Sequence, residues 1–119
     1  SLQLSTNLSE RVTGDHALGK QLIYVPLLQL NESFSWSKNS WGFTMNYHYE
    51  SRRFTADDHS SELAAYNIAS IALYKKVKLK YTMLDIGFNI DNLFSQDYQL
   101  VQGRPMPGRT LKLNFHCYL

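Results

Sequence analysis

Alternation of apolar and polar residues with a period of two constrains this chain most, because it is typical of a β-strand with two unlike faces. The clearest run spans residues 41–50, WGFTMNYHYE, with aromatic and apolar residues at every odd position. The same alternation ends the chain, over residues 109–119. Helical periodicity is nearly absent, and its one candidate, Ser60 to Tyr66, is too short to hold a helix. The sequence therefore predicts an all-β fold.

Six strands are predicted, over residues of about 2–12, 25–36, 41–50, 66–74, 79–91 and 109–119. Parity is ambiguous only in the fourth: Ala69, Ile71 and Leu73 suggest one apolar face, whereas Ile68 and Tyr74 have the opposite parity. Long polar loops (13–24, 51–65, 93–108) alternate with short turns (37–40, 75–78). This order predicts an antiparallel up-and-down meander with its large loops at one end.

Strand length points to a membrane. The predicted runs are mostly about 9 to 13 residues long, whereas strands of soluble proteins average about 5 to 6. A transmembrane β-strand needs about 9 to 11 residues at its usual tilt. Aromatic residues also flank the predicted turns and loops, as in an interfacial girdle, although Tyr and Trp are favourable strand residues in any sheet. These positions are Trp36, Trp41, Tyr49, Tyr66, Tyr74 and Tyr81.

The predicted polar face would be costly in a dry core and ordinary along a water-filled lumen. It carries amides, charges and two histidines: Thr44, Asn46, His48, Glu50, Asp85, Asn89, Lys112, Asn114 and His116. The apolar face would then meet lipid. Glu32 is the exception, because it falls on the apolar parity and would be costly near a membrane midplane unless a bulge shifts the register.

Composition sets limits on domain number and partners. A chain of 119 residues forms one domain or less. Its net charge of +2 is too small to predict a nucleic-acid partner, and the lysines at 75, 76, 78 and 80 surround a predicted turn, where lysines usually face water. Cys117 is the single cysteine, so it predicts neither a disulfide framework nor a zinc site. No apolar run reaches the roughly 20 residues of a membrane-spanning helix, and no signal peptide is recognised.

The C-terminal third has a distinctive order of residues. Asn92, Leu93 and Phe94 are followed by Tyr98 and then by GRPMPGR at 103–109, which contains Pro105, Pro107, Gly108 and Arg109. Upstream, GKQLIYVP at 19–26 and AYNIA at 65–69 precede or open strands. Together these pieces resemble TonB-dependent outer-membrane receptors, whose strands start with G-K-x-L-x-Y-x-P and A-Y-x-x-x patterns. The resemblance covers essentially the whole chain, residues 1–119.

That resemblance implies a transmembrane barrel of about 22 strands around an N-terminal plug, in the outer membrane of a Gram-negative bacterium. The family takes up scarce nutrients such as iron–siderophore, haem or cobalamin, driven by TonB contact near the N-terminus. Residues 1–119 would be the last six strands, with the long loops extracellular. The expected partners are outer-membrane lipid, the missing plug and strands, TonB and the nutrient ligand. The chain starts inside an apparent strand at Ser1 and Leu2, so we expect a fragment that cannot transport alone.

One departure from the family concerns the last residue. The family usually ends in an aromatic residue that the barrel-assembly machinery reads, whereas this chain ends Tyr118-Leu119. Alternation nevertheless continues to the end. The departure bears on assembly rather than on fold.

No catalytic, cofactor or metal constellation is predicted, and the chain is not expected to be an enzyme. Asp57, Asp58 and His59 could be taken for a metal or acid/base cluster, but they lie in a long polar loop where such residues are usually solvated. The loop residues predicted to contact a ligand are Arg52, Arg53, Asp57, Asp58, Tyr98 and Arg104. Asn92 is expected to close a turn with its side chain, and Pro105, Pro107 and Gly108 to shape the loop.

The alternative is a soluble, lipocalin-like β-rich module that binds a small molecule with its apolar face inside. Strand number separates the two hypotheses, because about eight strands are the practical minimum for a closed barrel and six leave two open edges. An isolated fragment is therefore expected to associate through its edges, above all through residues 109–119.

Overall fold

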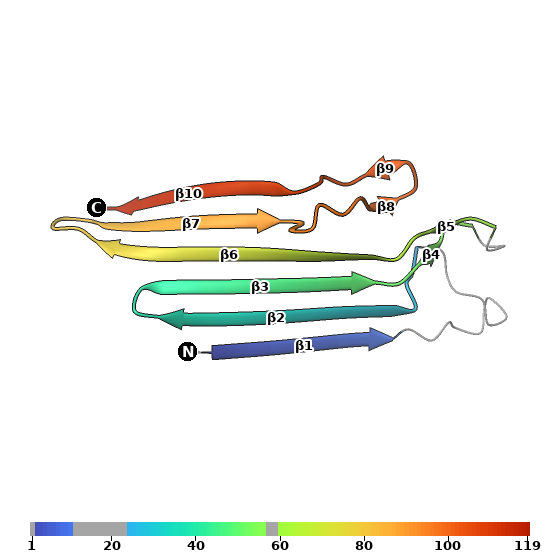
Figure 1. Cartoon of the computed structure of the whole chain (residues 1–119), viewed down its shortest axis with the longest axis horizontal. Coiled ribbons are helices and arrows are strands. Elements are labelled where there is room, and N and C mark those ends of the chain that lie inside the picture. Colours follow the sequence, from blue (N-terminus) through green and yellow to red (C-terminus); the bar gives the residue numbers. More distant parts are fainter. Residues whose placement is uncertain (1, 11–23, 57–59) are drawn as a thin grey trace.

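Six long strands form one antiparallel sheet (Figure 1). The computed structural model describes residues 2–10, 24–56 and 60–119. The sheet order is β1-β2-β3-β6-β7-β10, so each long strand pairs with the next long strand along the chain. The strands are β1 (Leu2–Glu10), β2 (Leu28–Lys38), β3 (Trp41–Glu50), β6 (Tyr66–Lys78), β7 (Met83–Asp91) and β10 (Thr110–Tyr118). The predicted all-β meander is confirmed.

The connections divide the sheet into two unlike ends. Tight turns at 39–40 and 79–82 form the short-turn end, and Asn39 and Ser40 both have positive φ (50° and 71°). Such a two-residue turn matches the twist of the strands it joins. The opposite, long-loop end carries two small hairpins: β4 (Arg53–Phe54) with β5 (Glu62–Leu63), and β8 (Gln99–Val101) with β9 (Arg104–Pro105).

Several predicted boundaries are wrong. β6 continues to Lys78 and β7 starts only at Met83, so Lys75, Lys76 and Lys78 lie in a strand and the turn is 79–82. β6 is longer because β7 pairs with its residues as far as Lys78, while β3 pairs with it as far as Lys75. β2 starts at Leu28 rather than residue 25, since Pro26 has no N–H to donate to a ladder. β2 also runs two residues past its predicted end.

The stretch from Ser60 to Tyr66, judged too short to hold a helix, contains β5 and the start of β6. The described residues contain no helix, and none of their elements is a helix long and apolar enough to cross a membrane. Residues 11–23, which include most of the first predicted loop and most of the motif at 19–26, lie outside the described residues.

Strand register places the two predicted faces on opposite sides of the sheet. One cross-strand row joins Phe34, Met45, Ile71, Ile90 and Leu111 over five strands. We call the side of this row the apolar face and the opposite side the polar face. The parity of the fourth strand is settled, since Ala69, Ile71 and Leu73 pair with Tyr47, Met45 and Phe43.

Glu32 stays on the apolar face. It pairs with Thr6 and with Tyr47 in an unbroken register, so no bulge turns it away. A carboxylate therefore interrupts an otherwise apolar surface near the middle of β2.

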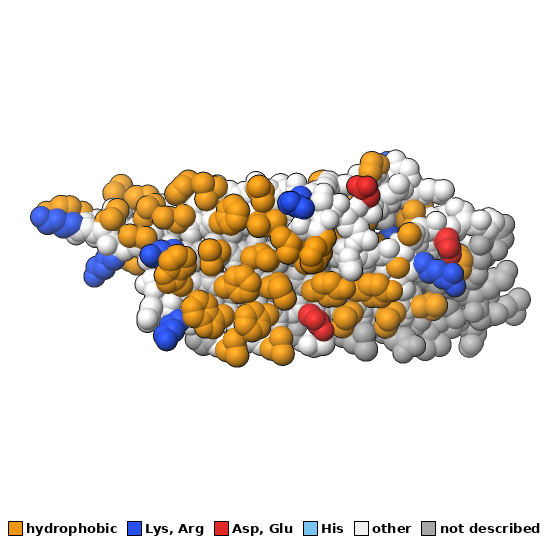
Figure 2. Space-filling view, viewed as in Figure 1, with side chains coloured by type: hydrophobic (Ala, Val, Ile, Leu, Met, Phe, Trp, Pro, Cys, Tyr) orange, Lys and Arg blue, Asp and Glu red, His pale blue; other side chains and the backbone are white. Residues whose placement is uncertain are grey.

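The described part of the chain contains no second layer over the sheet. Its buried apolar residues are Pro26, Leu63, Tyr66 and Ala69, all towards the long-loop end. Side chains of the apolar face are open to their surroundings, as Figure 2 shows; Trp41 is 42% exposed and Leu111 is 62% exposed. β1 and β10 are the two edges of the sheet. Burial is thus concentrated at the long-loop end, where the candidate site lies.

Candidate functional site

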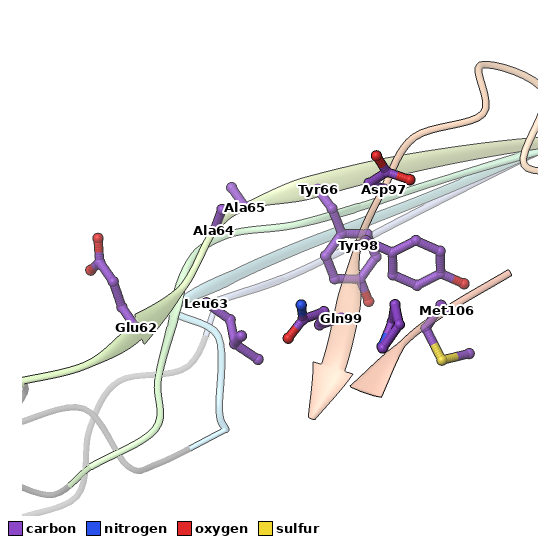
Figure 3. Close-up of a pocket in the computed structure, with 10 residues that line it drawn as sticks. Glu62, Leu63, Ala64, Ala65, Tyr66, Asp97, Tyr98, Gln99 and Met106 are labelled. Carbon is purple, nitrogen blue, oxygen red and sulfur yellow. The ribbon is translucent and has the colours of Figure 1, made fainter. Parts of the chain in front are cut away.

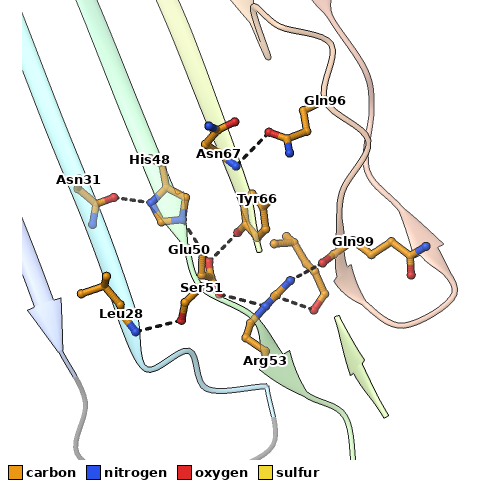
Figure 4. Close-up of polar contacts among 11 residues, drawn as sticks. Leu28, Asn31, His48, Glu50, Ser51, Arg53, Tyr66, Asn67, Gln96 and Gln99 are labelled. Carbon is orange, nitrogen blue, oxygen red and sulfur yellow. Dashed lines mark hydrogen bonds and ion pairs between the residues drawn. The ribbon is translucent and has the colours of Figure 1, made fainter. Parts of the chain in front are cut away.

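A buried polar cluster joins β3 and β6 at the long-loop end of the polar face (Figure 4). Glu50 is the last residue of β3, Tyr66 is the first residue of β6, and the register pairs them. The Tyr66 hydroxyl donates a hydrogen bond of 2.6 Å to Oε2 of Glu50. Burial, together with this carboxylate, raises the pKa of the Tyr66 phenol above its usual value. The phenol therefore stays protonated and remains the donor.

Arg53 connects this cluster to the second hairpin. Its Nε lies 3.4 Å from Oε1 of Glu50, and its guanidinium lies over the Tyr66 ring, 5.2 Å from the centroid. Nη2 donates to the carbonyl of Gln99 at 2.6 Å and Nη1 to that of Leu100 at 3.3 Å. Since the Arg53 side chain is only 3% exposed, its charge is balanced almost entirely by these partners. Arg53 thus fixes β8 against the end of β3.

His48 and Asn31 extend the cluster to β2. Nε2 of His48 lies 3.1 Å from Oε2 of Glu50, and Nδ1 lies 2.5 Å from the Asn31 side-chain oxygen. The His48 ring is also 5.8 Å from the Tyr66 ring, between centroids. The end of the polar face is therefore tied together across three strands by side chains.

A pocket of about 270 Å³ lies beside the cluster, between β5 and the β8–β9 hairpin (Figure 3). The rings of Tyr66 and Tyr98 stack in it, 4.8 Å apart at 27°. Two carboxylates, two aromatic rings and a thioether give it both charged and apolar walls. The lining residues are Glu62, Leu63, Ala64, Ala65, Tyr66, Asp97, Tyr98, Gln99, Pro105 and Met106. This arrangement could hold a small molecule with a flat apolar part and hydrogen-bond donors.

Asn92 organises the loop that supports this pocket. It is 4% exposed and has a positive φ of 52°. Its Nδ2 donates to the carbonyls of Gln96 and Pro107, at 2.9 and 3.3 Å, and its Oδ1 accepts from the Gln96 N–H at 2.9 Å. Leu93 N–H donates to the Ala69 carbonyl, which ties the same loop to β6. The Asn92 side chain therefore closes its turn and also bridges both sides of the loop.

The other motif residues have mixed surroundings. Phe94 is 65% exposed, whereas Leu93 is half-buried. Pro105 lines the pocket. The Arg109 N–H donates to Oγ of Ser95 at 3.5 Å, and a Cβ at Gly108 would lie 3.4 Å from the same oxygen.

The loop residues predicted to contact a ligand have different surroundings. Tyr98 lines the pocket, and Arg104 is exposed on β9. Arg53 is buried and holds the hairpin, while exposed Arg52 lies 3.6 Å from Oε2 of Glu62. Asp57 and Asp58 lie outside the described residues.

Glu50 and Tyr66 were not predicted as site residues. From the sequence, Glu50 was predicted only to lie on the polar face, and Tyr66 only to be an aromatic residue of the interfacial girdle. Their meeting depends on the pairing of β3 with β6 across a long loop, which no local signal in the sequence specifies.

No His, Cys, Asp or Glu cluster suited to a metal ion is present in the part of the chain that the structure describes. Compared with known proteins, the chain matches no family model and no curated protein. The functional proposal therefore depends on the geometry of the sheet and on the resemblance of its loop motifs.

Proposed function

We propose that this chain is a six-stranded segment of a larger transmembrane β-barrel, the C-terminal part of a TonB-dependent outer-membrane receptor. The receptor would take up a scarce nutrient such as iron–siderophore, haem or cobalamin. The exposed apolar face of the sheet is the observation that supports this most. A single-layer sheet with one broadly apolar, open side needs an apolar solvent or another layer to cover it.

Strand dimensions support lipid as that solvent. β2, β3 and β6 have 11, 10 and 13 residues, and β7 and β10 have 9 each. About 9 to 11 tilted residues cross a bilayer core. In β6 the membrane segment would run from Ala69 to Val77, which leaves Tyr66 and the polar cluster outside it. The aromatic residues Trp36, Trp41 and Tyr49 would then lie near the two interfaces.

The polar face and the loops fit the other parts of the proposal. Amide and hydroxyl side chains on the polar face suit a lumen that holds water and the plug. The long-loop end would be extracellular, so the pocket beside Tyr98 and exposed Arg104 would meet the incoming nutrient. TonB would act through the N-terminal region of the complete receptor, and the isolated segment would not transport.

The lipocalin-like alternative has less support. It requires a closed barrel with the apolar face inside, but β1 and β10 are opposite edges in the order of the described strands. The apolar face would also have to be enclosed, whereas its tryptophans and leucines are exposed.

Tryptophan quenching by brominated lipid tests the proposal. Trp36 and Trp41 are the only tryptophans, and both lie at one end of the apolar face. In reconstituted phosphatidylcholine vesicles, we expect acyl-chain bromine near the headgroup to quench them more strongly than bromine near the bilayer centre. Acrylamide in the water should quench weakly. The soluble alternative would be supported by two results together: brominated lipid does not quench the tryptophans, and the protein remains a monomer without detergent.

Transport is tested separately in Gram-negative cells that produce the complete receptor. Labelled iron–siderophore, haem and cobalamin serve as the panel of probes. We expect uptake of one of them, and its loss when TonB is deleted. Uptake that persists without TonB would contradict the receptor class while leaving membrane insertion untouched.

A further inference from the structure

A row of two lysines and one tryptophan crosses the apolar face at the short-turn end. Lys38 on β2 pairs with Trp41 on β3, and Trp41 pairs with Lys75 on β6, so the three side chains share one face. Nζ of Lys75 lies 4.4 Å from the centroid of the Trp41 ring. Figure 2 shows lysines along this border of the apolar surface. The row therefore places two positive charges where the apolar face ends.

A groove of about 180 Å³ adjoins this row. Its walls are the side chains of Trp41, Leu73, Ile86 and Phe88, with Tyr74 and Lys75 completing the lining. Since Lys75 and Trp41 belong to both the row and the groove, the two features form one continuous surface. An apolar groove that starts at the Lys75 ammonium, with a second lysine two strands away in the same row, suits a phospholipid, whose acyl chain would lie in the groove and whose phosphate would lie beside the lysines.

Charge at this end of the sheet favours an anion. Residues 36–41 and 74–83 include five lysines, at positions 38, 75, 76, 78 and 80, and no aspartate or glutamate. The nearest carboxylate along β7 is Asp85, which has polar-face parity and pairs with Lys76. The cation–π contact holds the Lys75 ammonium at the face border while leaving its N–H groups able to donate. At the short-turn end of the apolar face, no carboxylate among the described residues is placed to neutralise Lys38 or Lys75.

We propose that Lys38, Trp41 and Lys75 form a binding site for the headgroup of an anionic phospholipid, whose acyl chain lies in the adjoining groove. The inference rests on the proposed function, since it requires the apolar face to lie in a bilayer. It adds the lipid class and the end of the sheet at which that lipid binds. Tryptophan at an interface and lysines whose stems lie on apolar surface are suited to this position.

Lipid selectivity at Trp41 tests the site. A Trp36→Phe background leaves Trp41 as the only tryptophan. The protein is reconstituted in mixed vesicles of phosphatidylglycerol and phosphatidylcholine, with bromine on one lipid or on the other. We expect phosphatidylglycerol to quench Trp41 more strongly at equal content, because it is enriched beside the two lysines.

Two double variants with the same change in net charge distinguish a specific lipid site from nonspecific electrostatic attraction of the protein to an anionic membrane. Lys38→Gln/Lys75→Gln and Lys76→Gln/Lys78→Gln both lower the formal net charge from +2 to 0. A lysine near an anionic surface contributes about fivefold in binding, so the first variant should lose roughly 25-fold in preference for phosphatidylglycerol. The second changes residues of polar-face parity and should keep most of the preference. Equal losses in the two variants would overturn the site.

The remaining outcomes distinguish the site from the membrane proposal. If brominated phosphatidylcholine quenches Trp41 but the original protein shows no preference, the lipid site is wrong and the membrane-spanning sheet stands. If neither lipid quenches Trp41, both are wrong. Inorganic phosphate alone, followed by phosphorus NMR without vesicles, should not bind. Saturable binding of inorganic phosphate that Lys38→Gln/Lys75→Gln removes would make this a phosphate site and overturn the lipid assignment.

Discussion

Glu50 is the residue on which the long-loop end depends most. Its carboxylate accepts from Tyr66, faces Nε of Arg53 and lies against His48. Arg53 is buried, so its charge has little access to water once Glu50 is neutral. Removing one partner of a buried pair costs more than the pair itself contributes, because the other charge stays buried.

Glu50→Gln should therefore lower the free energy of unfolding by about 3 kcal/mol, measured by urea titration in detergent micelles. The glutamine side-chain oxygen can still accept from Tyr66 and lie beside Nε2 of His48, so the loss of stability reports mainly on the buried charge of Arg53. Glu62→Gln is the matched control: its partner Arg52 and Glu62 itself have side chains 64% and 48% exposed. That pair should contribute about 0–1 kcal/mol. If the two substitutions lowered the free energy of unfolding equally, the burial of Arg53 would not be the cause of the loss.

Gly42 is required by the ring of Tyr74. A Cβ at Gly42 would lie 1.8 Å from Cζ of Tyr74, so this ring lies directly over the glycine backbone of the neighbouring strand. Gly87 occupies a comparable strand position, but a Cβ there would meet Asn114 at an ordinary 3.7 Å.

Gly42→Ala should displace the Tyr74 ring and cost about 1–3 kcal/mol of stability. Gly87→Ala should be neutral or slightly stabilising, because alanine restricts the unfolded chain. Urea titrations of both variants check this difference. In a Tyr74→Ala background the cost of Gly42→Ala should largely disappear; a cost that persists there would exclude the ring as its cause.

At the scale of elements, the β8–β9 hairpin has few attachments to the sheet. Arg53 holds its two carbonyls from one side, and Asn92 closes its base from the other. Tyr98 adds the ring stack with Tyr66. These contacts, together with an exposed bond from Gln102 Nε2 to Ser61 Oγ at 3.4 Å, hold the hairpin beside β5 and shape the pocket.

Asn92→Ala should loosen residues 92–109 without melting the sheet. It removes three hydrogen bonds of about 1 kcal/mol each and places alanine at a positive φ. We expect amide hydrogen exchange in this loop to accelerate at least tenfold, while β6 and β7 stay protected. Asn92→Gly, which tolerates the backbone angle, should recover only part of the protection. Gln102→Ala is the control in the same loop, and faster exchange there as well would argue against a specific role of Asn92.

At the scale of the whole molecule, the described strands form a sheet with two open edges and an uncovered apolar face. β1 and β10 each present one unpaired side, and the apolar face exposes residues of every long strand. Unpaired strand edges are templates for further pairing, and large apolar patches associate in water.

The purified chain should therefore not be a compact monomer in detergent-free buffer. Light scattering should give a mass well above 13.8 kDa, because edges and apolar faces associate. Added detergent should disperse the assemblies by covering the apolar face. A stable 13.8 kDa particle without detergent would contradict the open-sheet arrangement and the membrane proposal.

The alternating stretches from Trp41 to Glu50 and from Arg109 to Leu119 determined much of this fold by themselves. Strand type, face and order along a meander are local properties, since side chains alternate with period two and short turns force neighbours to pair. The turn-closing role of Asn92 was predictable for the same reason, because its hydrogen bonds to Gln96 join residues four apart. Its bond to the distant Pro107 carbonyl was not predictable in this way. Strand ends were less predictable, because the end of β6 is determined by its pairing with β7 rather than by its own lysines.

Only the tertiary structure decided which residues meet at the long-loop end. Glu50, Arg53 and Tyr66 come together because β3 pairs with β6 in one register, and the pocket forms because the second hairpin folds back onto them. The row of Lys38, Trp41 and Lys75 likewise exists only in that register. The contacts of Glu50 with Tyr66 and of Trp41 with Lys75 join residues far apart in the chain, and their energies depend on burial that no local pattern encodes. The sequence by itself determined two faces and six strands, and the pairing of those strands determined the sites.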